Sequence, residues 1–365
     1  MRHRPVIVKI GTSSITDDVG AIDRTAVARL CVDVAGVHRR QPVVIVTSGA
    51  IAAGLPALGL PERPSDSVTL QAASAVGQIG LLGAYQEELA QQGLVTGQLL
   101  LAPLDFVVRS QYLHARNTLG RLLELGVVPV INENDAIADD EIRFGDNDRL
   151  AALVAHLADA ELLVLLTDTE GVLTADPRID TSASLIEEIV EFDHQLESRA
   201  GGAGSARGSG GMASKLTAAK IAAWSGVRTV IASASRPGVL AAAVAGESGV
   251  GTVVVPRSER LGARKLWIAF AVGSKGSVAV DAGARRALQD GGRSLLAAGV
   301  MSVHGAFDVG DAIEMVDPDG VVFAKGLVRH DSVDLEGLAG KRSADLPDGA
   351  PSVVIHRDDL VMLPE

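Results

Sequence analysis

A glycine-rich stretch ends at a lysine in residues 201–215, whose sequence is GGAGSARGSGGMASK. Glycine lets backbone N–H groups approach an anion closely, and the N-terminus of the helix predicted at 213–224 adds unpaired donors and partial positive charge. The same dipole disfavours Lys215 in the first turn unless a polyphosphate lies between them. A flexible loop with a surface lysine is the alternative. The P-loop consensus G-x-x-x-x-G-K-[ST] occurs nowhere in the chain.

A second lysine, Lys9, lies within the apolar run 6–10 and precedes Gly11. A lysine inside a buried strand is costly unless it is paired or faces a ligand. At the carboxyl end of a strand the side chain can point into a ligand-binding crevice, and we expect Lys9 to do so. The alternative is an edge-strand lysine that reaches solvent.

Small and hydroxyl residues directly follow the apolar run 43–46, in the order Thr47, Ser48, Gly49 and Ala50. Backbone N–H groups of small residues after a strand can hold a carboxylate or a phosphate. An ordinary tight turn between a strand and a helix has the same composition. Taken alone, the segment leaves both interpretations open.

Amide and carboxylate side chains are concentrated in residues 131–148, INENDAIADDEIRFGDND. Such a cluster suits an ammonium group with neutral polar contacts, or a metal ion. No histidine joins it at ligand spacing, so we predict no metal ion held by the protein itself. Asp146 is the predicted N-cap of a helix over 146–157. The candidate binding residues are Asn132, Asn134, Asp135, Asn147 and Asp148.

Thr167 and Asp168 follow another apolar run, 162–166. An aspartate at the end of a buried strand can position lysines or border a nucleotide, whereas a turn or N-cap aspartate before Gly171 is the alternative. Two lysines, a glycine-rich loop and carboxylates at strand ends together indicate phosphoryl transfer, which needs positioning and positive charge more than covalent chemistry. A carboxylate acceptor would need no general base, because it is ionised at neutral pH.

The elements that must position these residues alternate along the first 255 residues. Short apolar runs alternate with amphipathic stretches, which predicts an α/β fold: a mainly parallel open sheet sandwiched by helices. In such folds ligands bind at the carboxyl ends of the strands. The predicted strands are 6–10, 43–46, 127–131, 162–166, 229–232 and 252–255. The predicted helices are 23–39, 68–92, 111–125, 146–157 and 213–224.

The pattern changes after Pro256. A charged connector, 257–264, leads to a predicted helix at 283–290 and short strands separated by Gly and Asp, at 299–304, 312–316, 321–327 and 353–355. We therefore expect two domains, residues 1–257 and a smaller, mostly β domain at 258–365. From Gly262 onward, 11 Lys and Arg stand against 15 Asp and Glu, a net charge of −4, so the second domain is not a basic module.

Composition limits the class of protein. The chain of 365 residues is 47% apolar but only 3% aromatic, which is typical of buried parallel strands and the helices that cover them. The single cysteine, Cys31, rules out an internal disulfide and indicates a reducing compartment. We predict neither a signal peptide nor a membrane span, and so expect a cytoplasmic protein. A net charge of −12 is unfavourable for general nucleic-acid binding.

Six segments resemble the amino acid kinase family, and within it the members that act on L-glutamate. They are VIVKIGTSSIT, VTSGAIAAG, VVPVINENDAI, FGDNDRLAALVA, LLTDTEGVLTADPR and GSGGMASKLTAAK, which span essentially the whole first domain. The resemblance implies transfer of the γ-phosphate of ATP to the side-chain carboxylate of L-glutamate, giving L-glutamyl 5-phosphate in the first step of proline synthesis. It also implies Mg²⁺ bound with the nucleotide, a homo-oligomer (dimer or tetramer) and inhibition by L-proline.

The resemblance assigns catalytic and nucleotide-binding roles to matching residues. Lys9 and Lys215 would neutralise charge on the moving phosphoryl group, and Asp168 would hold both lysines in position. Ser209 stands where threonine is common in the family and keeps the hydroxyl. The implied nucleotide-binding set is Lys9, Thr167, Asp168, Ser209, Gly210, Gly211, Met212, Ala213, Ser214 and Lys215.

The resemblance also assigns the acceptor site. Ser48 and the amides that follow it would bind the carboxylates of glutamate. Asp135, Asn147 and Asp148 would bind its α-amino end. The implied acceptor-binding set is Ser48, Gly49, Ala50, Asn134, Asp135, Asn147 and Asp148.

Two other functions compete with this interpretation. Another activity of the same superfamily would act on aspartate, acetylglutamate, carbamate or a nucleotide, although the Asn/Asp cluster favours a free amino group and so argues against acetylglutamate and UMP. RNA binding is the second, because the second domain resembles a PUA domain. Its net charge of −4 makes RNA an unfavourable partner, and such binding would depend steeply on salt.

Overall fold

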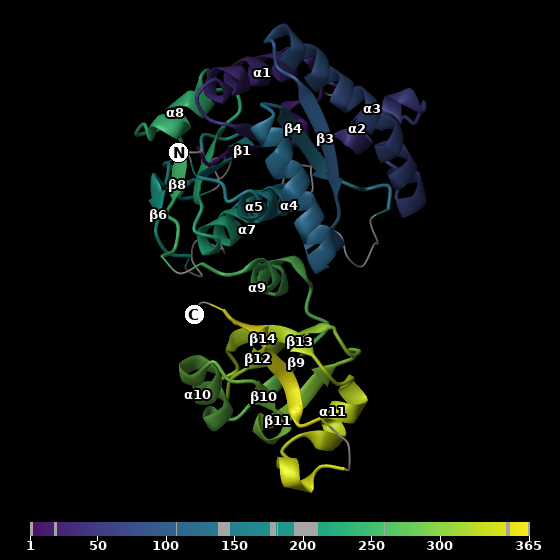
Figure 1. Ribbon diagram of the computed structural model, residues 1–365, viewed down its shortest axis with the longest axis vertical. Coiled ribbons are helices and arrows are strands. Elements are labelled where there is room, and N and C mark those ends of the chain that lie inside the picture. Colours follow the sequence, from purple (N-terminus) through teal and green to yellow (C-terminus); the bar gives the residue numbers. More distant parts are fainter. Residues whose placement is uncertain are drawn as a thin grey trace. The chain divides into compact units, whose positions relative to one another are not determined.

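Two compact units make up the chain, Met1–Leu261 and Gly262–Glu365. Their division lies slightly beyond the boundary that we expected after residue 257. The structure is a computed structural model, and it describes residues 3–17, 20–106, 108–137, 147–175, 180, 182–192, 211–258, 260–347 and 351–363. Figure 1 shows the two units, each with a sheet of its own.

An eight-stranded sheet forms the centre of the first unit, in the order β3-β4-β2-β1-β5-β7-β8-β6. Its strands pair in parallel except that β7 and β8 are antiparallel. The expected mainly parallel open sheet is therefore confirmed. The strands are β1 (Val6–Ile10), β2 (Val43–Val46), β3 (Thr96–Leu101), β4 (Val128–Glu133), β5 (Leu162–Thr167), β6 (Glu188–Ile189), β7 (Arg228–Ser233) and β8 (Thr252–Val254).

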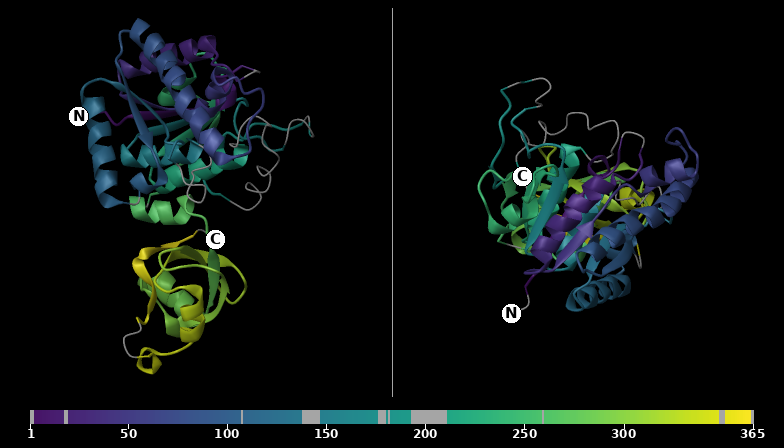
Figure 2. Two further views of the ribbon diagram at one scale, coloured as in Figure 1. Left: turned by 90° about the vertical axis from the view of Figure 1, so that its right-hand side faces the viewer. Right: turned by 90° about the horizontal axis from the view of Figure 1, so that it is seen from above.

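Helices cover both faces of this sheet. Helices α1, α3 and α8 lie on one face, while α4, α5 and α7 lie on the other (Figure 2). The helices are α1 (Arg24–His38), α2 (Ala50–Ala57), α3 (Ser67–Gln91), α4 (Arg109–Glu124), α5 (Asn147–Leu157), α7 (Met212–Trp224) and α8 (Val239–Ala245), with short 3₁₀ helices at Thr12–Ser14 and Pro103–Phe106. Among the described residues, no helix combines the length and hydrophobicity that a bilayer crossing requires.

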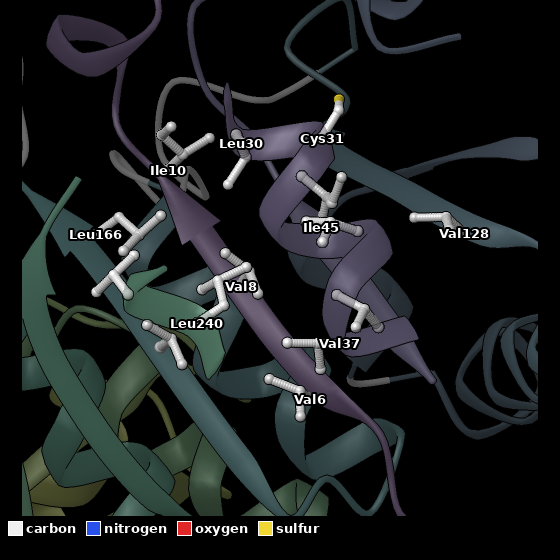
Figure 3. Close-up of a cluster of buried hydrophobic side chains, with 14 of the residues drawn as sticks. Val6, Val8, Ile10, Leu30, Cys31, Val37, Ile45, Val128, Leu166 and Leu240 are labelled. Atoms are coloured by element: carbon white, nitrogen blue, oxygen red, sulfur yellow. The ribbon is translucent and has the colours of Figure 1, made fainter. Parts of the chain in front are cut away.

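The side chains of β1 alternate between the two faces of the sheet. Val6, Val8 and Ile10 belong to the core that β1 shares with α1, which includes the buried Cys31 (Figure 3). Lys9 therefore points to the opposite face, where α5 and α7 pack. Since β1 pairs with β2 and β5, Lys9 lies between Val46 and Leu165 in the middle of the sheet.

Polar side chains set the start of the long helices. The side chain of Asp23 accepts hydrogen bonds from Thr25 and Ala26 and caps α1, and that of Asp66 accepts from Thr69 and caps α3. Both aspartates lie just outside the helices they cap. For this reason α1 begins at Arg24, one residue later than we predicted, and α3 begins at Ser67, one residue earlier than we predicted.

The second unit contains a six-stranded sheet in the order β10-β14-β13-β12-β9-β11, antiparallel except between β12 and β9. The expected mostly β domain is confirmed, although β14 continues well beyond the predicted residue 355. Its elements are α9 (Ala263–Leu266), a π-helix (Trp267–Ala271), β9 (Gly276–Val280), α10 (Ala282–Gly291), β10 (Leu295–Leu296), a 3₁₀ helix (Ala297–Gly299), β11 (Val300–Gly305), β12 (Ala312–Val316), β13 (Val322–Val328), α11 (Ser332–Leu338), a 3₁₀ helix (Ser343–Asp345) and β14 (Val353–Met362).

Two glycines let α2 and α3 touch through their backbones. A Cβ atom at Gly54 would lie 1.9 Å from the carbonyl oxygen of Ala73, and one at Gly77 would lie 2.0 Å from that of Ala50. Both distances are far below van der Waals contact with main-chain atoms that cannot rotate away. The contact therefore fixes α3 against the start of α2, which directly follows Ser48 and Gly49.

We predict that Gly77→Ala lowers the free energy of unfolding by about 1–3 kcal/mol, because the added methyl group forces the two helices apart. Gly83 on the same helix is the matched control, since a Cβ atom there meets nothing within 4 Å. Gly83→Ala should instead stabilise the helix by about 0.5–1 kcal/mol. Urea unfolding of both variants measures this difference, and equal effects would contradict the tight contact.

Candidate active site

One buried carboxylate, Asp148, bridges the two predicted lysines. Its Oδ1 lies 2.5 Å from Nζ of Lys9, and its Oδ2 lies 3.2 Å from Nζ of Lys215. Ser214 donates from its hydroxyl to the same Oδ2 at 3.2 Å. The side chains of Asp148, Lys9 and Lys215 are only 0%, 4% and 7% exposed. The structure thus brings both lysines into one ionic cluster.

Three elements on one face of the sheet position this cluster. Lys9 comes from β1, Asp148 from the first turn of α5, and Lys215 from the first turn of α7. An N-terminal helix dipole favours Asp148 but disfavours Lys215. The carboxylate of Asp148 compensates for that unfavourable placement and makes the burial of both cations possible.

Burial and charge act in opposite directions on the pKa of Asp148. Burial raises the pKa of this carboxyl group, but the ammonium groups of Lys9 and Lys215, together with their hydrogen bonds, outweigh burial and lower it below its ordinary value. Asp148 is therefore ionised at neutral pH. Its carboxylate contacts the ammonium groups of both lysines.

We expected Asp168 to hold the two lysines, and the structure corrects that assignment. Asp168 is exposed at the end of β5, where its side chain accepts from the hydroxyl of Thr167 at 3.0 Å. Strand position alone indicated Asp168, but helix packing brings Asp148 between the lysines. Both oxygens of Asp148 face cations, and its expected part in binding an α-amino group stays a prediction.

A second polar cluster surrounds the start of α5. Asn147 donates from Nδ2 to Oγ of Ser48 at 3.2 Å, and its Oδ1 accepts from the backbone N–H of Glu133 at 3.1 Å. Gly49 has a φ of +100°, which lets the chain turn directly from Ser48 into α2 at Ala50. The structure therefore joins Ser48 and Asn147, which are far apart in sequence.

The other predicted acceptor residues follow β4. Asn134 continues the pairing of the strand through its backbone N–H, which donates to the carbonyl of Leu101 at 2.9 Å. Asp135 comes next, and its Oδ2 accepts from the hydroxyl of Ser74 on α3 at 2.8 Å. Both residues are half-buried at the same end of the sheet as Ser48.

The described part of the glycine-rich stretch is the N-terminus of α7. Gly211 is its N-cap, with an extended backbone, and Met212 and Ala213 begin the first turn. The first N–H groups of an α-helix have no partner within the helix, which makes a helix N-terminus suitable for an anion. The predicted residues Ser209 and Gly210 lie outside the described residues, as does Asp146.

Sequence reasoning missed two polar residues of α3, Ser74 and Gln78. Ser74 bonds to Asp135, and Gln78 accepts from Nδ2 of Asn132 at 2.7 Å. They are four residues apart and so lie on one face of the helix, between buried positions at Leu70 and Leu81. The sequence did contain a signal for these two residues, because polar side chains four residues apart interrupt an otherwise apolar helix face.

The described residues contain no group of three or more His, Cys, Asp or Glu side chains that could hold a metal ion. Magnesium commonly uses one or two carboxylates together with substrate phosphates.

We predict that Asp148→Asn destabilises the fold by about 3–5 kcal/mol, because two buried cations lose their counter-charge. Asp168→Asn is the matched control and should change the free energy of unfolding by less than about 0.5 kcal/mol, since Asp168 is exposed. Urea unfolding at pH 7 measures both. A larger effect at Asp168 would contradict the assignment of Asp148.

The free energy of unfolding of wild type and that of Asp148→Asn should differ less in acid. The pKa of Asp148 is lower in the folded state than its ordinary value of 3.8, so its contribution to stability is present above pH 3.8 and is lost as pH falls through the folded value. We therefore expect the stability gap between wild type and Asp148→Asn to narrow below about pH 4. A gap independent of pH would contradict this.

Comparison with known proteins shows the family of the chain. The sequence pattern of the amino acid kinase family matches residues 4–233, and that of the PUA domain matches residues 276–349. A glutamate 5-kinase of Burkholderia vietnamiensis is 45% identical over 363 residues, which cover 98% of this chain and 97% of the relative. A glutamate 5-kinase of Trichlorobacter lovleyi is 44% identical over 365 residues, which cover 99% and 97%.

A solved structure of isopentenyl phosphate kinase shares the fold of the first unit. It is 21% identical, covers 69% of this chain and 100% of its own, and superposes with a TM-score of 0.50. At that identity the likeness bears on the fold alone. The family pattern spans more than half of the chain, and the curated relatives match nearly all of it. The chain therefore belongs to the amino acid kinase family and carries a PUA domain in its second unit.

Proposed function

We propose that the protein transfers the γ-phosphoryl group of ATP to the side-chain carboxylate of L-glutamate. The product is L-glutamyl 5-phosphate, the first intermediate of L-proline biosynthesis. One observation carries the proposal: Asp148 contacts two buried lysines, one of them in the first turn of α7, and the preceding residue, Asn147, contacts Ser48. The names of the similar glutamate 5-kinases support the choice of acceptor.

The nucleotide would lie at the N-terminus of α7. Backbone N–H groups near Gly211 suit phosphate oxygens, while Thr167 and Asp168 at the end of β5 would border the nucleotide. A Mg²⁺ ion bound with ATP would supply further positive charge on the phosphates. Lys9 and Lys215 would stabilise the charge on the phosphoryl group as it moves.

The acceptor would lie on the other side of the lysines. The Ser48 hydroxyl and the backbone amides of Gly49 and Ala50 suit its carboxylates. Asp135, oriented by Ser74, suits its ammonium group, with Asn134 and Asn147 as neutral contacts. The attacking carboxylate is ionised at neutral pH, so the site needs to position it in line rather than remove a proton.

The family resemblance also leads us to propose a cytoplasmic homo-oligomer, a dimer or tetramer, that L-proline inhibits. Exposed apolar side chains on α3 support association between copies. Val68 and Ile79 on this helix are 72% and 77% exposed. They are eleven residues apart, about three helical turns, and so lie on the same face of α3.

An acyl phosphate product gives the direct test. Purified protein with ATP, Mg²⁺, L-glutamate and hydroxylamine should form glutamyl hydroxamate, because hydroxylamine traps acyl phosphates. Reactions with L-aspartate and N-acetyl-L-glutamate serve as controls and should form far less hydroxamate. Product from either of these, with none from glutamate, would reject the proposed acceptor.

Replacement of Lys215 separates catalysis from acceptor binding. We expect Lys215→Ala to lower kcat by about 10²–10³-fold, as loss of a charge-stabilising group does, with a change in KM for glutamate below about threefold. Lys220→Ala is the matched control, because Lys220 lies on the same helix but over the ring of Phe192. Steady-state kinetics of both variants measure this, and unchanged kcat in Lys215→Ala would remove Lys215 from the mechanism.

A further inference from the structure

Gln78 is buried against Asn132 of β4, and apolar packing alone does not explain a glutamine at this position. Its side chain is on α3 and is 8% exposed. Its Oε1 accepts from Nδ2 of Asn132 at 2.7 Å, while its Nε2 has no hydrogen-bond partner within the part of the chain that the structure describes. A buried donor left without an acceptor costs about 1–3 kcal/mol. An apolar side chain of similar size would remove that cost but would leave Nδ2 of Asn132 without its acceptor, so the contribution of glutamine lies in its Oε1.

A chain of hydrogen bonds leads from Gln78 to the acceptor site. The backbone N–H of Glu133 donates to Oδ1 of Asn132 at 2.9 Å and to Oδ1 of Asn147 at 3.1 Å. A backbone N–H can only donate, so it fixes which end of each amide is the oxygen. Nδ2 of Asn132 must then face Gln78, and Nδ2 of Asn147 must face Oγ of Ser48.

The direction of this chain determines what Ser48 can offer. Its Oγ accepts from Asn147 at 3.2 Å, so the hydroxyl proton is directed elsewhere and can be donated. A hydroxyl that donates suits a carboxylate, which only accepts when ionised. Gln78 secures the far end of the chain, because without its Oε1 the amide of Asn132 would have a buried donor of its own to satisfy.

We propose that Gln78 is a positioning residue for the acceptor site. Through Asn132, Glu133 and Asn147 it holds the Ser48 hydroxyl as a donor toward the acceptor carboxylate. This inference rests on the proposed phosphorylation of a carboxylate acceptor and adds a residue outside the site that sets acceptor affinity. It predicts a change in KM for the acceptor and no change in KM for ATP.

Kinetics of Gln78→Met provide the first measurement. We expect KM for glutamate to rise about 3- to 10-fold, the range set by one hydrogen bond, with KM for ATP unchanged. Gln86→Met on the same helix is the matched control, because Gln86 is exposed. Equal rises in the two KM values, or no rise for glutamate, would overturn the proposal.

A double-mutant cycle with Ser48→Ala distinguishes positioning from a general structural effect. If Gln78 acts through the Ser48 hydroxyl, Gln78→Met should raise KM for glutamate no further in the Ser48→Ala background. Ser74→Ala is the comparison within the cycle, since Ser74 bonds to Asp135 and its effect should add to that of Ser48→Ala. Additive effects of Gln78→Met would overturn the proposal.

A second variant covers the case in which Gln78→Met folds poorly. Gln78→Met combined with Asn132→Leu replaces both partners of the buried bond by apolar groups, which is commonly tolerated. It should keep the raised KM for glutamate with wild-type KM for ATP, and a wild-type KM for glutamate would overturn the proposal. If wild type phosphorylates another carboxylate instead of glutamate, the proposed function fails while the same cycle, run on that acceptor, still tests Gln78.

Discussion

The ionic contact of Asp148 with Lys9 and Lys215 is the constraint on which the rest of the first unit depends. Two ammonium groups at 4% and 7% exposure would repel each other and lose their hydration without a carboxylate between them. The sheet supplies one cation, and two packed helices supply the other cation and the anion. The packing of α5 and α7 on this face therefore brings the three charged groups together and also buries apolar side chains.

The first turn of α5 connects the two halves of the site. Asn147 reaches Ser48, and the next residue, Asp148, reaches both lysines. Adjacent residues at a helix start point in different directions, so one backbone segment contacts both Ser48 and the two lysines. In the proposed reaction such a link would hold the acceptor and the phosphoryl group at a set separation, which an in-line transfer requires.

Much of this architecture could be predicted from sequence, because buried parallel strands are continuous apolar runs. The bounds of β1 and β2 match the runs 6–10 and 43–46. The edge strand β3 was missed because Thr96–Leu101 is only partly buried and mixes Thr, Gly and Gln with leucine. Helix α2 was missed because Gly54 and Pro56 are poor helix formers.

The partner of the lysines was misassigned because helix packing, which sequence spacing does not reveal, decides which aspartate reaches them. The roles of Ser74 and Gln78 depend on contacts between α3 and β4, which only the fold defines.

The backbone contact between α2 and α3 has a consequence for how adjustable the acceptor site is. Ser48 stands just before α2, whereas Ser74 and Gln78 stand on α3, and Gly54 and Gly77 set the distance between the two helices. A close contact between main-chain atoms cannot be relieved by a change of side-chain rotamer. The spacing of α2 and α3 is therefore set by their backbones, and exchanging Ser48, Ser74 or Gln78 changes the polarity of the proposed acceptor site without changing that spacing.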